Sequence, residues 1–462
     1  MYSKRARNSG FAVILTATDE PPGESWSTQF SRVALKAGGD ACALGVWLFL
    51  LFFCVLPVFS QSPDAYTLPP EKYQQAIEYS LTRYKLYFLN TGLTFALLAA
   101  FIGLKLAPRL RAWAEACSRW RLAQAFIVTA PLLLLFSLLT LPLEIYAKHL
   151  ANFYGVSVQS WGDWLADWGK GELLNILVTA PLIWLLYVVL RRWPERAWFV
   201  FWLASLPLIA AVVFVMPVLV DPLFNKFTPL AQTQPQLVAE MGKVTQRGGL
   251  DIPPERMFEM DASSKTRALN AYVTGLGATK RVVVWDTTTQ EMTQAQTLFV
   301  FGHEMGHYVL NHIFQGLALG CLGSLALFWL AFHLARRLIK QYGARWAISG
   351  LGDWASLPLI LLIAAVLSFA GEPIANAFSR HLEHEADVYG LEVTHGLVPD
   401  NQKAAAEAFQ ILGEKSLAHP NPPAFVKFWL FSHPPIAERL KFAREYDPWT
   451  KGAPRYVFSG KP

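Results

Sequence analysis

The chain has 462 residues, of which 53% are hydrophobic and only 16% are charged, and its formal net charge is +6. Because a typical soluble domain carries about a quarter charged residues, this composition excludes an ordinary soluble protein. The excess of basic residues is concentrated in short loops between apolar runs. That distribution favours membrane topology over nucleic-acid binding.

The N-terminal region begins with a polar stretch, residues 1–42, which shows no hydrophobic periodicity. We expect it to be a disordered tail. The first apolar run follows at residues 43–59. With Arg32 and Lys36 before it, this run fits either a retained membrane span or a cleavable signal peptide. We favour a retained span, and the alternative stays open.

Further apolar runs are long enough to cross a bilayer, which takes about twenty helical residues. They lie at residues 87–107, 123–146, 173–190, 197–220, 314–335 and 355–373. One such run alone could be a buried core helix. Together with the first run they predict about seven transmembrane helices, because short basic loops separate them.

After residue 220 polar and apolar residues mix, with Pro and Gly between them. Residues 235–247 predict an amphipathic helix with a proline in its first turn. The β-branched run 281–285 predicts a strand, and residues 270–275 are its expected partner. A helix should begin near Thr293, since residues 293–296 fit the capping-box pattern.

That helix carries the motif HEMGH at residues 303–307. On a helix His303 and His307 are one turn apart on the same face, with Glu304 beside them. This is the pattern of a zinc metalloprotease, with two histidine ligands and a glutamate as general base. The alternative is a pair of core histidines satisfied by the backbone, but burying three such groups without a partner is costly.

Three other residues of this region have simpler interpretations. Gly302 and Gly306 weaken a helix intrinsically, so we expect a neighbouring backbone to approach them closely. His312 is interpreted as packing or capping at the helix end.

A catalytic zinc takes three protein ligands and a water, so a third ligand must exist. Ile313 stands where the metzincin class would have a histidine, which excludes that class. In the stretch SRHLEHEADVY at residues 379–389, Glu383 and Asp387 are one helical turn apart. One can bind zinc while the other orients a ligand histidine. Spacing does not exclude three competitors, His381, His384 and Glu385.

The expected organisation therefore has five sections. They are a disordered tail over 1–42, five transmembrane helices with loops over 43–220, a catalytic segment with the zinc helix over 221–313, two further transmembrane helices over 314–377, and a second catalytic segment with the third zinc ligand and a C-terminal tail over 378–462.

These motifs resemble those of the type I CAAX prenyl proteases, which are integral-membrane zinc metalloendopeptidases, and of their bacterial relatives. The resemblance covers nearly the whole chain after the first apolar run. Besides HEMGH and SRHLEHEAD, three stretches match in order: DPLFNKFTPL at 221–230, NAY at 270–272 and SHPPIAERL at 432–440.

The resemblance implies that Glu383 is the third ligand of one zinc ion per chain and that Asp387 supports a ligand histidine. It also implies that Asn270 and His433 face the scissile carbonyl and that Arg439 braces the site. A neutral amide and an imidazole are suitable donors to a developing oxyanion. The implied fold is a mainly α polytopic membrane protein with a zinc-protease α/β domain assembled from two sequence segments around a water-filled chamber.

We therefore expect a membrane-embedded zinc metalloendopeptidase that cleaves membrane-associated or exported proteins, with Glu304 as the base. Its expected partners are a peptide or protein substrate and membrane lipid, without nucleic acid. The alternative function is a polytopic channel or transporter with a structural zinc site. A closed structural site needs a fourth protein ligand, whereas the motifs supply three ligands and a base.

The expected location is a bacterial inner membrane, because the chain ends in FSGKP rather than in the dilysine-type retrieval signal of many eukaryotic members. Positive residues favour the cytoplasmic side of short loops. The basic clusters at 191–196 and 336–345, with Arg32 and Lys36, predict a catalytic domain that faces the periplasm. When every apolar run is counted as a membrane crossing, the cluster at 105–121 falls on the opposite side of the membrane from these clusters.

Overall fold

The computed structural model describes residues 66–275 and 280–456, without the side chains of residues 212–218. These residues belong to one compact unit, Phe59–Pro462. The expected tail and the first apolar run, with the question of its cleavage, lie outside the described residues.

Within the described ranges, five helices are long and apolar enough to cross a membrane. They are α3 (Pro70–Gly103), α5 (Arg121–Phe153), α6 (Trp161–Arg192), α13 (His312–Trp346) and α14 (Leu357–Thr394). A helix satisfies its backbone hydrogen bonds internally, which the interior of a bilayer requires. Large apolar side chains remain exposed along these helices, among them Leu138 (57%) and Leu322 (66%). Such a surface suits contact with lipid.

The expected total of about seven spans is not confirmed. Five of the predicted runs each overlap one of the five long helices. The run at 197–220 forms helix α7 (Ala197–Leu219), in which the residues with described side chains, Ala197–Ala211, make up an apolar helix. The run at 43–59 lies outside the described residues.

Helix α14 continues well beyond the end of its predicted span. The run was expected to end at Pro373, yet the helix passes through that proline and ends only at Thr394. A proline removes one backbone donor, and the rest of the helix keeps its internal bonds. The expected section boundary at residue 378 therefore falls inside one continuous helix.

The sheet contains β1 (Phe227–Pro229), β2 (Met257–Met260), β3 (Ala271–Thr274) and β4 (Arg281–Trp285), in the order β1-β2-β4-β3. Strands β2 and β4 are parallel, and the other two pairs are antiparallel. The predicted strand at 281–285 and its partner are confirmed. The three valines of β4 are fully buried.

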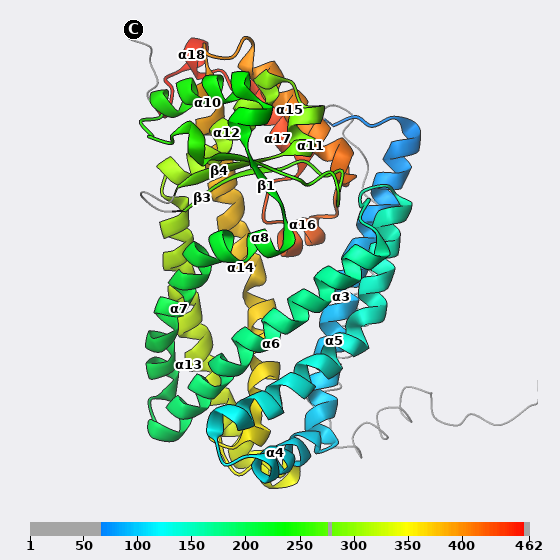
Figure 1. Cartoon of the computed structure of the whole chain (residues 1–462), viewed down its shortest axis with the longest axis vertical. Coiled ribbons are helices and arrows are strands. Elements are labelled where there is room, and N and C mark those ends of the chain that lie inside the picture. Colours follow the sequence, from blue (N-terminus) through cyan, green and yellow to red (C-terminus); the bar gives the residue numbers. More distant parts are fainter. Residues whose placement is uncertain (1–65, 276–279, 457–462) are drawn as a thin grey trace, which may run out of the picture. The chain divides into compact units, whose positions relative to one another are not determined.

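Shorter helices complete the described part. They are α4 (Leu106–Cys117), α8 (Asp221–Phe224), α9 (Leu230–Thr233), α10 (Pro235–Arg247), α11 (Asp286–Glu291), α12 (Gln294–Val309), α15 (Asn401–Ser416), α16 (Ala424–Leu430), α17 (Ile436–Glu445) and α18 (Pro448–Lys451), with 3₁₀ turns at Pro254–Arg256 and Trp354–Ser356. The amphipathic helix predicted at 235–247 is α10. The sheet, α10, α12, α15 and α17 gather at one end of the long helices, and α4 lies at the other end (Figure 1).

Helix α12 begins with the predicted capping box. The Thr293 hydroxyl accepts a hydrogen bond from the backbone N–H of Gln296, and the Gln296 side chain accepts one from the backbone N–H of Thr293. From there α12 packs along α14 and against α15. Most of its residues up to Gly306 are buried.

Glycines allow α12 and α14 to approach at backbone distance. A Cβ atom on Gly302 would lie 3.3 Å from the carbonyl oxygen of Gly390, and one on Gly306 would lie 3.2 Å from Cα of Ala386. In the opposite direction, a Cβ on Gly390 would lie 2.9 Å from the backbone nitrogen of His303. The close approach predicted for Gly302 and Gly306 is confirmed.

We predict that Gly390→Ala destabilises the protein by about 1–3 kcal/mol, because the methyl group overpacks a contact made by backbone atoms. Thermal unfolding of the purified protein in detergent would measure this. Gly371→Ala on the same helix is the control, since its Cβ would meet no atom within 4 Å. Equal unfolding temperatures for the two variants would contradict the prediction.

Candidate functional site

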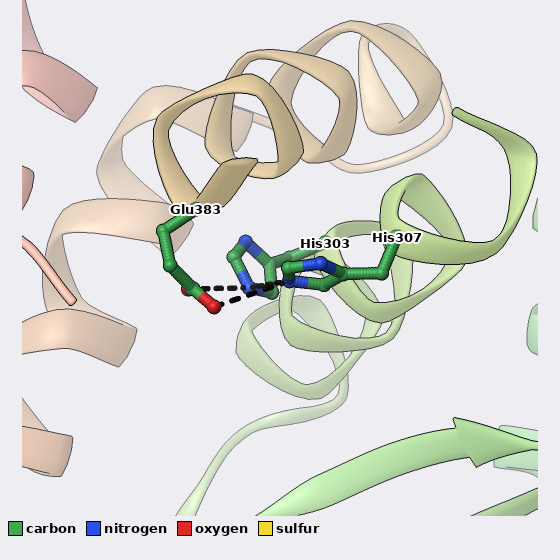
Figure 2. Close-up of side chains that lie close together, drawn as sticks. All are labelled: His303, His307 and Glu383. Atoms are coloured by element: carbon green, nitrogen blue, oxygen red, sulfur yellow. Dashed lines mark hydrogen bonds and ion pairs between the residues drawn. The ribbon is translucent and has the colours of Figure 1, made fainter. Parts of the chain in front are cut away.

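His303 and His307 on α12 meet Glu383 on α14 at the contact between the two helices (Figure 2). The Nε2 atoms of the two histidines are 3.2 Å apart. The Glu383 carboxylate lies 3.3 Å from His303 Nε2 through one oxygen and 3.4 Å from His307 Nε2 through the other. Two imidazole nitrogens and one carboxylate group thus converge on one point.

The spacing of these atoms fits a zinc ion. Ligands at about 2 Å from a tetrahedral ion are about 3.3 Å from each other, which is the separation observed. Oε2 of Glu383 is also buried, and its neighbours are Nε2 of His303 at 3.3 Å and the guanidinium of Arg439 at 3.8 Å. A buried carboxylate is costly unless its charge is compensated, and a cation bound between the three side chains would add to that compensation.

His303 is oriented by two buried, oppositely charged residues. Its Nδ1 lies 2.9 Å from Oδ1 of Asp387. Arg439 on α17 donates two hydrogen bonds to the same carboxylate, at 2.9 and 2.6 Å. Burial by itself favours the neutral imidazole, but the hydrogen bonds to Asp387 and Glu383 raise the pKa of His303 to about 10. The arrangement fixes the ring with Nε2 toward Glu383.

His307 is held by a residue whose role the sequence did not reveal. Nδ1 of His312, the first residue of α13, lies 3.1 Å from Nδ1 of His307. The other nitrogen of His312 lies 3.5 Å from Glu385, which in turn pairs with Arg455 at 2.9 Å. Burial and the charge of His303 lower the pKa of His307 to about 3. A neutral imidazole is the form that binds a metal.

The competitors for the third ligand are engaged elsewhere. His381 is 61% exposed, and His384 packs edge-on against Phe442. Glu385 contacts His312 and Arg455. Only Glu383 joins the two motif histidines in the metal-ligand group found among the described residues.

Glu304 lines a cavity of about 620 Å³ beside the three residues. Its carboxylate lies 4.0 Å from Nε2 of His303. Burial raises the pKa of Glu304 to about 7, and the neighbouring Glu383 adds to the shift, although His303 opposes it. The cavity is also lined by Asn270 and His433.

Asn270 and His433 differ in how firmly they are held. The side-chain oxygen of Asn270 accepts the backbone N–H of Ala271 at 2.9 Å, which leaves the amide N–H groups available for another acceptor. His433 is 57% exposed, and its Nε2 lies 3.2 Å from Oε1 of Glu383. Both predicted residues therefore line the cavity, one with its amide oxygen bonded to the backbone and one as an exposed imidazole beside Glu383.

Two family models match the chain. One is described as peptidase family M48 and matches residues 231–447, and the other is described as CAAX prenyl protease N-terminal, five membrane helices, and matches residues 59–226. The expected resemblance is therefore confirmed over most of the length of the chain.

Curated relatives give the same result. The chain is 34% identical over 390 residues to YhfN of Bacillus subtilis, described as an uncharacterised metalloprotease, with 84% of this chain and 88% of the relative covered. It is 26% identical over 335 residues to CAAX prenyl protease 1 of Saccharomyces cerevisiae, covering 69% of this chain and 71% of that protein. The crystal structure of S. mikatae Ste24p superimposes with a TM-score of 0.72 at 23% identity, covering 92% of this chain and all of that one, so the two share a fold.

We predict that Asp387→Asn weakens zinc binding by about 10–100-fold, because an amide cannot both accept from His303 and pair with Arg439. Competition against a chelator of known affinity would measure the change. Asp353→Asn is the control, since Asp353 is also paired with an arginine, Arg111, but lies just before the start of α14. Unchanged zinc affinity in Asp387→Asn would contradict the role of this carboxylate.

Proposed function

Because the chain belongs to peptidase family M48, we propose that it hydrolyses peptide bonds with one zinc ion held by His303, His307 and Glu383. Family membership makes the protein a membrane-embedded zinc metalloendopeptidase. The observation that carries the ligand assignment is the convergence of the two imidazoles and the Glu383 carboxylate, at separations that suit the ligands of a tetrahedral ion. A structural zinc site in a channel or transporter would need a fourth ligand, and the metal-ligand group among the described residues has three members.

In this proposal Glu304 is the general base. Zinc supplies Lewis acidity, which polarises the substrate carbonyl and lowers the pKa of a water to about 7. The Glu304 carboxylate takes a proton from the attacking water and returns it to the leaving amine. A cation held by the three residues would lower the burial-raised pKa of Glu304, and the carboxylate would then be ionised near neutral pH.

Asn270 and His433 are proposed to donate hydrogen bonds to the carbonyl oxygen as negative charge develops on it. The free amide N–H groups of Asn270 and the exposed ring of His433 line the same cavity as Glu304. Donors that are already in place need little reorganisation when the charge forms. Asp387 and Arg439 act through His303, whose ring they orient.

The proposed substrate is a peptide segment of a membrane-associated or exported protein. One wall of the cavity is formed by Arg83, Tyr84 and Tyr87 of α3, a candidate membrane span, and by Glu372 of α14. Apolar side chains such as Phe299 and Leu430 line other parts of the wall. An extended segment could therefore reach the zinc site beside the membrane helices. Membrane lipid, which would surround these helices, is the second expected partner.

We propose a bacterial inner membrane location with the catalytic end toward the periplasm. Three contacts bring the basic loops together: Arg111 with Asp353, Arg191 with Gly352, and Arg336 with Glu195. The cluster at 105–121, expected on the opposite side, therefore joins the other two, because the loops that carry them meet at the α4 end. Positive residues favour the cytoplasm, which supports an outward-facing zinc site.

We predict that His303→Ala, His307→Ala and Glu383→Ala each lose bound zinc, whereas Glu304→Gln retains it and loses about 10²–10⁴-fold in cleavage rate. Metal content after desalting and cleavage of labelled casein in detergent would be measured together. Zinc retained at one ion per chain in Glu383→Ala would move the third ligand to His384 or Glu385. Unchanged cleavage by Glu304→Gln would exclude Glu304 as the general base.

For the two proposed oxyanion donors, Asn270→Ala and His433→Ala should each lower kcat about a hundredfold or more and change KM less. The reason is that their hydrogen bonds strengthen only as the charge develops. Steady-state kinetics separates the two parameters. A raised KM with kcat unchanged would make these residues substrate-holding groups instead.

Orientation can be tested with single cysteines at two exposed positions: Gln290, in helix α11, which contacts the zinc helix α12, and Arg192, the last residue of α6. The background would lack the four native cysteines. A thiol reagent that cannot cross the inner membrane should label position 290 in intact cells and leave position 192 unlabelled. The reverse pattern would place the zinc site in the cytoplasm.

A further inference from the structure

A second cavity, of about 500 Å³, lies at the α4 end of the long helices. Arg111 of α4, Arg121 at the start of α5 and Arg191 in the last turn of α6 all line it. The loop before α14 supplies the remaining wall, including Gly352 and Trp354. Three arginines from separate helices are thus held around one space, where their mutual repulsion must be compensated.

The carboxylates of the cavity compensate this charge only in part. Asp353 is fully engaged, because it accepts hydrogen bonds from Arg111, from the backbone and hydroxyl of Ser349, and from the backbone of Ala355. Glu115 lies 3.9 Å from Arg121, and both side chains are about half exposed. An exposed pair at that distance contributes little. The cavity therefore keeps an excess of positive charge.

Arg191 is held in a fixed position without a carboxylate partner among the described residues. Its Nε donates to the carbonyl oxygen of Gly352 at 2.9 Å, and its guanidinium stacks 4.5 Å from the ring centre of Trp354. A Cβ on Gly352 would lie 3.1 Å from Cγ of Arg191, so glycine permits this approach. The terminal N–H groups of Arg191 remain available to a ligand in the cavity.

The cavity lies where candidate membrane spans end. Candidate spans start at Arg121 and Trp354 and end at Arg192 and Trp346. Exposed tryptophans lie within two residues in sequence of its lining residues, namely Trp113 (51%), Trp120 (80%) and Trp193 (43%). Tryptophan is enriched where a membrane meets water, so this cavity opens at the level of lipid headgroups.

We propose that this cavity binds a phosphate group, with Arg191, Arg121 and Arg111 as the donors. Guanidinium groups match phosphate oxygens in both charge and geometry. Basic pockets between membrane helices bind the headgroups of anionic lipids, and the position of the cavity offers it such a headgroup. The site is remote from the zinc centre, because α14 rises about 40 Å between Leu357 and Glu383 at 1.5 Å per residue.

The test is native mass spectrometry of the full-length, zinc-loaded protein released from detergent in the presence of phosphatidylglycerol. Wild type should retain this lipid, and Arg191→Gln and Arg121→Gln should each weaken retention about tenfold or more, since each removes a charged donor. Glu115→Gln should strengthen retention, because it removes the exposed negative charge. Arg119→Gln is the matched control, an exposed arginine next to the cavity that does not line it.

Two further measurements identify the source of the phosphate. Retention of phosphatidylglycerol over phosphatidylcholine, unaffected by millimolar inorganic phosphate, supports a lipid headgroup. Arg191-dependent binding of inorganic phosphate itself supports the site with a soluble ligand. Equal weakening by Arg119→Gln and Arg191→Gln, or no saturable binding of either phosphate source, would overturn the proposal.

Casein cleavage by the variants checks that they are folded, since none of these arginines belongs to the zinc site. If Arg191→Gln loses cleavage activity, Arg121→Gln is used for the test instead. The side chain of Arg121 is half exposed, so its replacement should not disturb the fold. Failure to bind either phosphate source with cleavage intact would reject the phosphate site and leave the proposed peptidase function standing.

Discussion

The site depends on one contact, the approach of helices α12 and α14 at backbone distance. Glycines stand on both sides of this contact, at Gly302, Gly306 and Gly390. The helices are so close there that a Cβ atom on any of these residues would displace atoms of the opposite helix. This proximity places the carboxylate of Glu383 within 3.4 Å of both histidine rings. A site made of short ligand distances tolerates little error in helix spacing, so the glycines serve the chemistry although they contact no substrate.

Buried charge then fixes the direction of each ring. Asp387 and Arg439 are both nearly inaccessible, and an isolated ion at either position would be costly. Their bidentate pairing offsets that cost and leaves one carboxylate oxygen close to His303. His307 has a different support, a second histidine backed by Glu385 and Arg455. The two motif histidines are thus held by two separate networks. A carboxylate contacts His303, whereas a second imidazole contacts His307.

The molecule has two chemically distinct ends, joined by α14. At one end this helix carries Glu383 and Asp387 into the peptidase site, and at the other it begins beside an arginine-lined cavity. Because α14 is continuous through Pro373, Glu383, the proposed third ligand, is anchored to a helix that begins in the membrane region. A substrate would meet the zinc site along walls formed by α3 and α14, which relates the peptidase chemistry to membrane-associated proteins.

The sequence alone determined the local features, because they depend on short-range rules. Spacing placed His303 and His307 on one helical face, the Thr293 capping box marked where that helix starts, and β-branched residues indicated β4. Its motifs also indicated the protein family. The tertiary structure decided what depends on contacts between distant segments. It grouped Glu383, rather than the neighbours that spacing left open, with the two motif histidines, and it gave His312 a partner. The reason is that a residue's neighbours across a helix interface are not encoded in its own periodicity. It also brought three separate basic loops to one end, which counting spans along the chain did not predict.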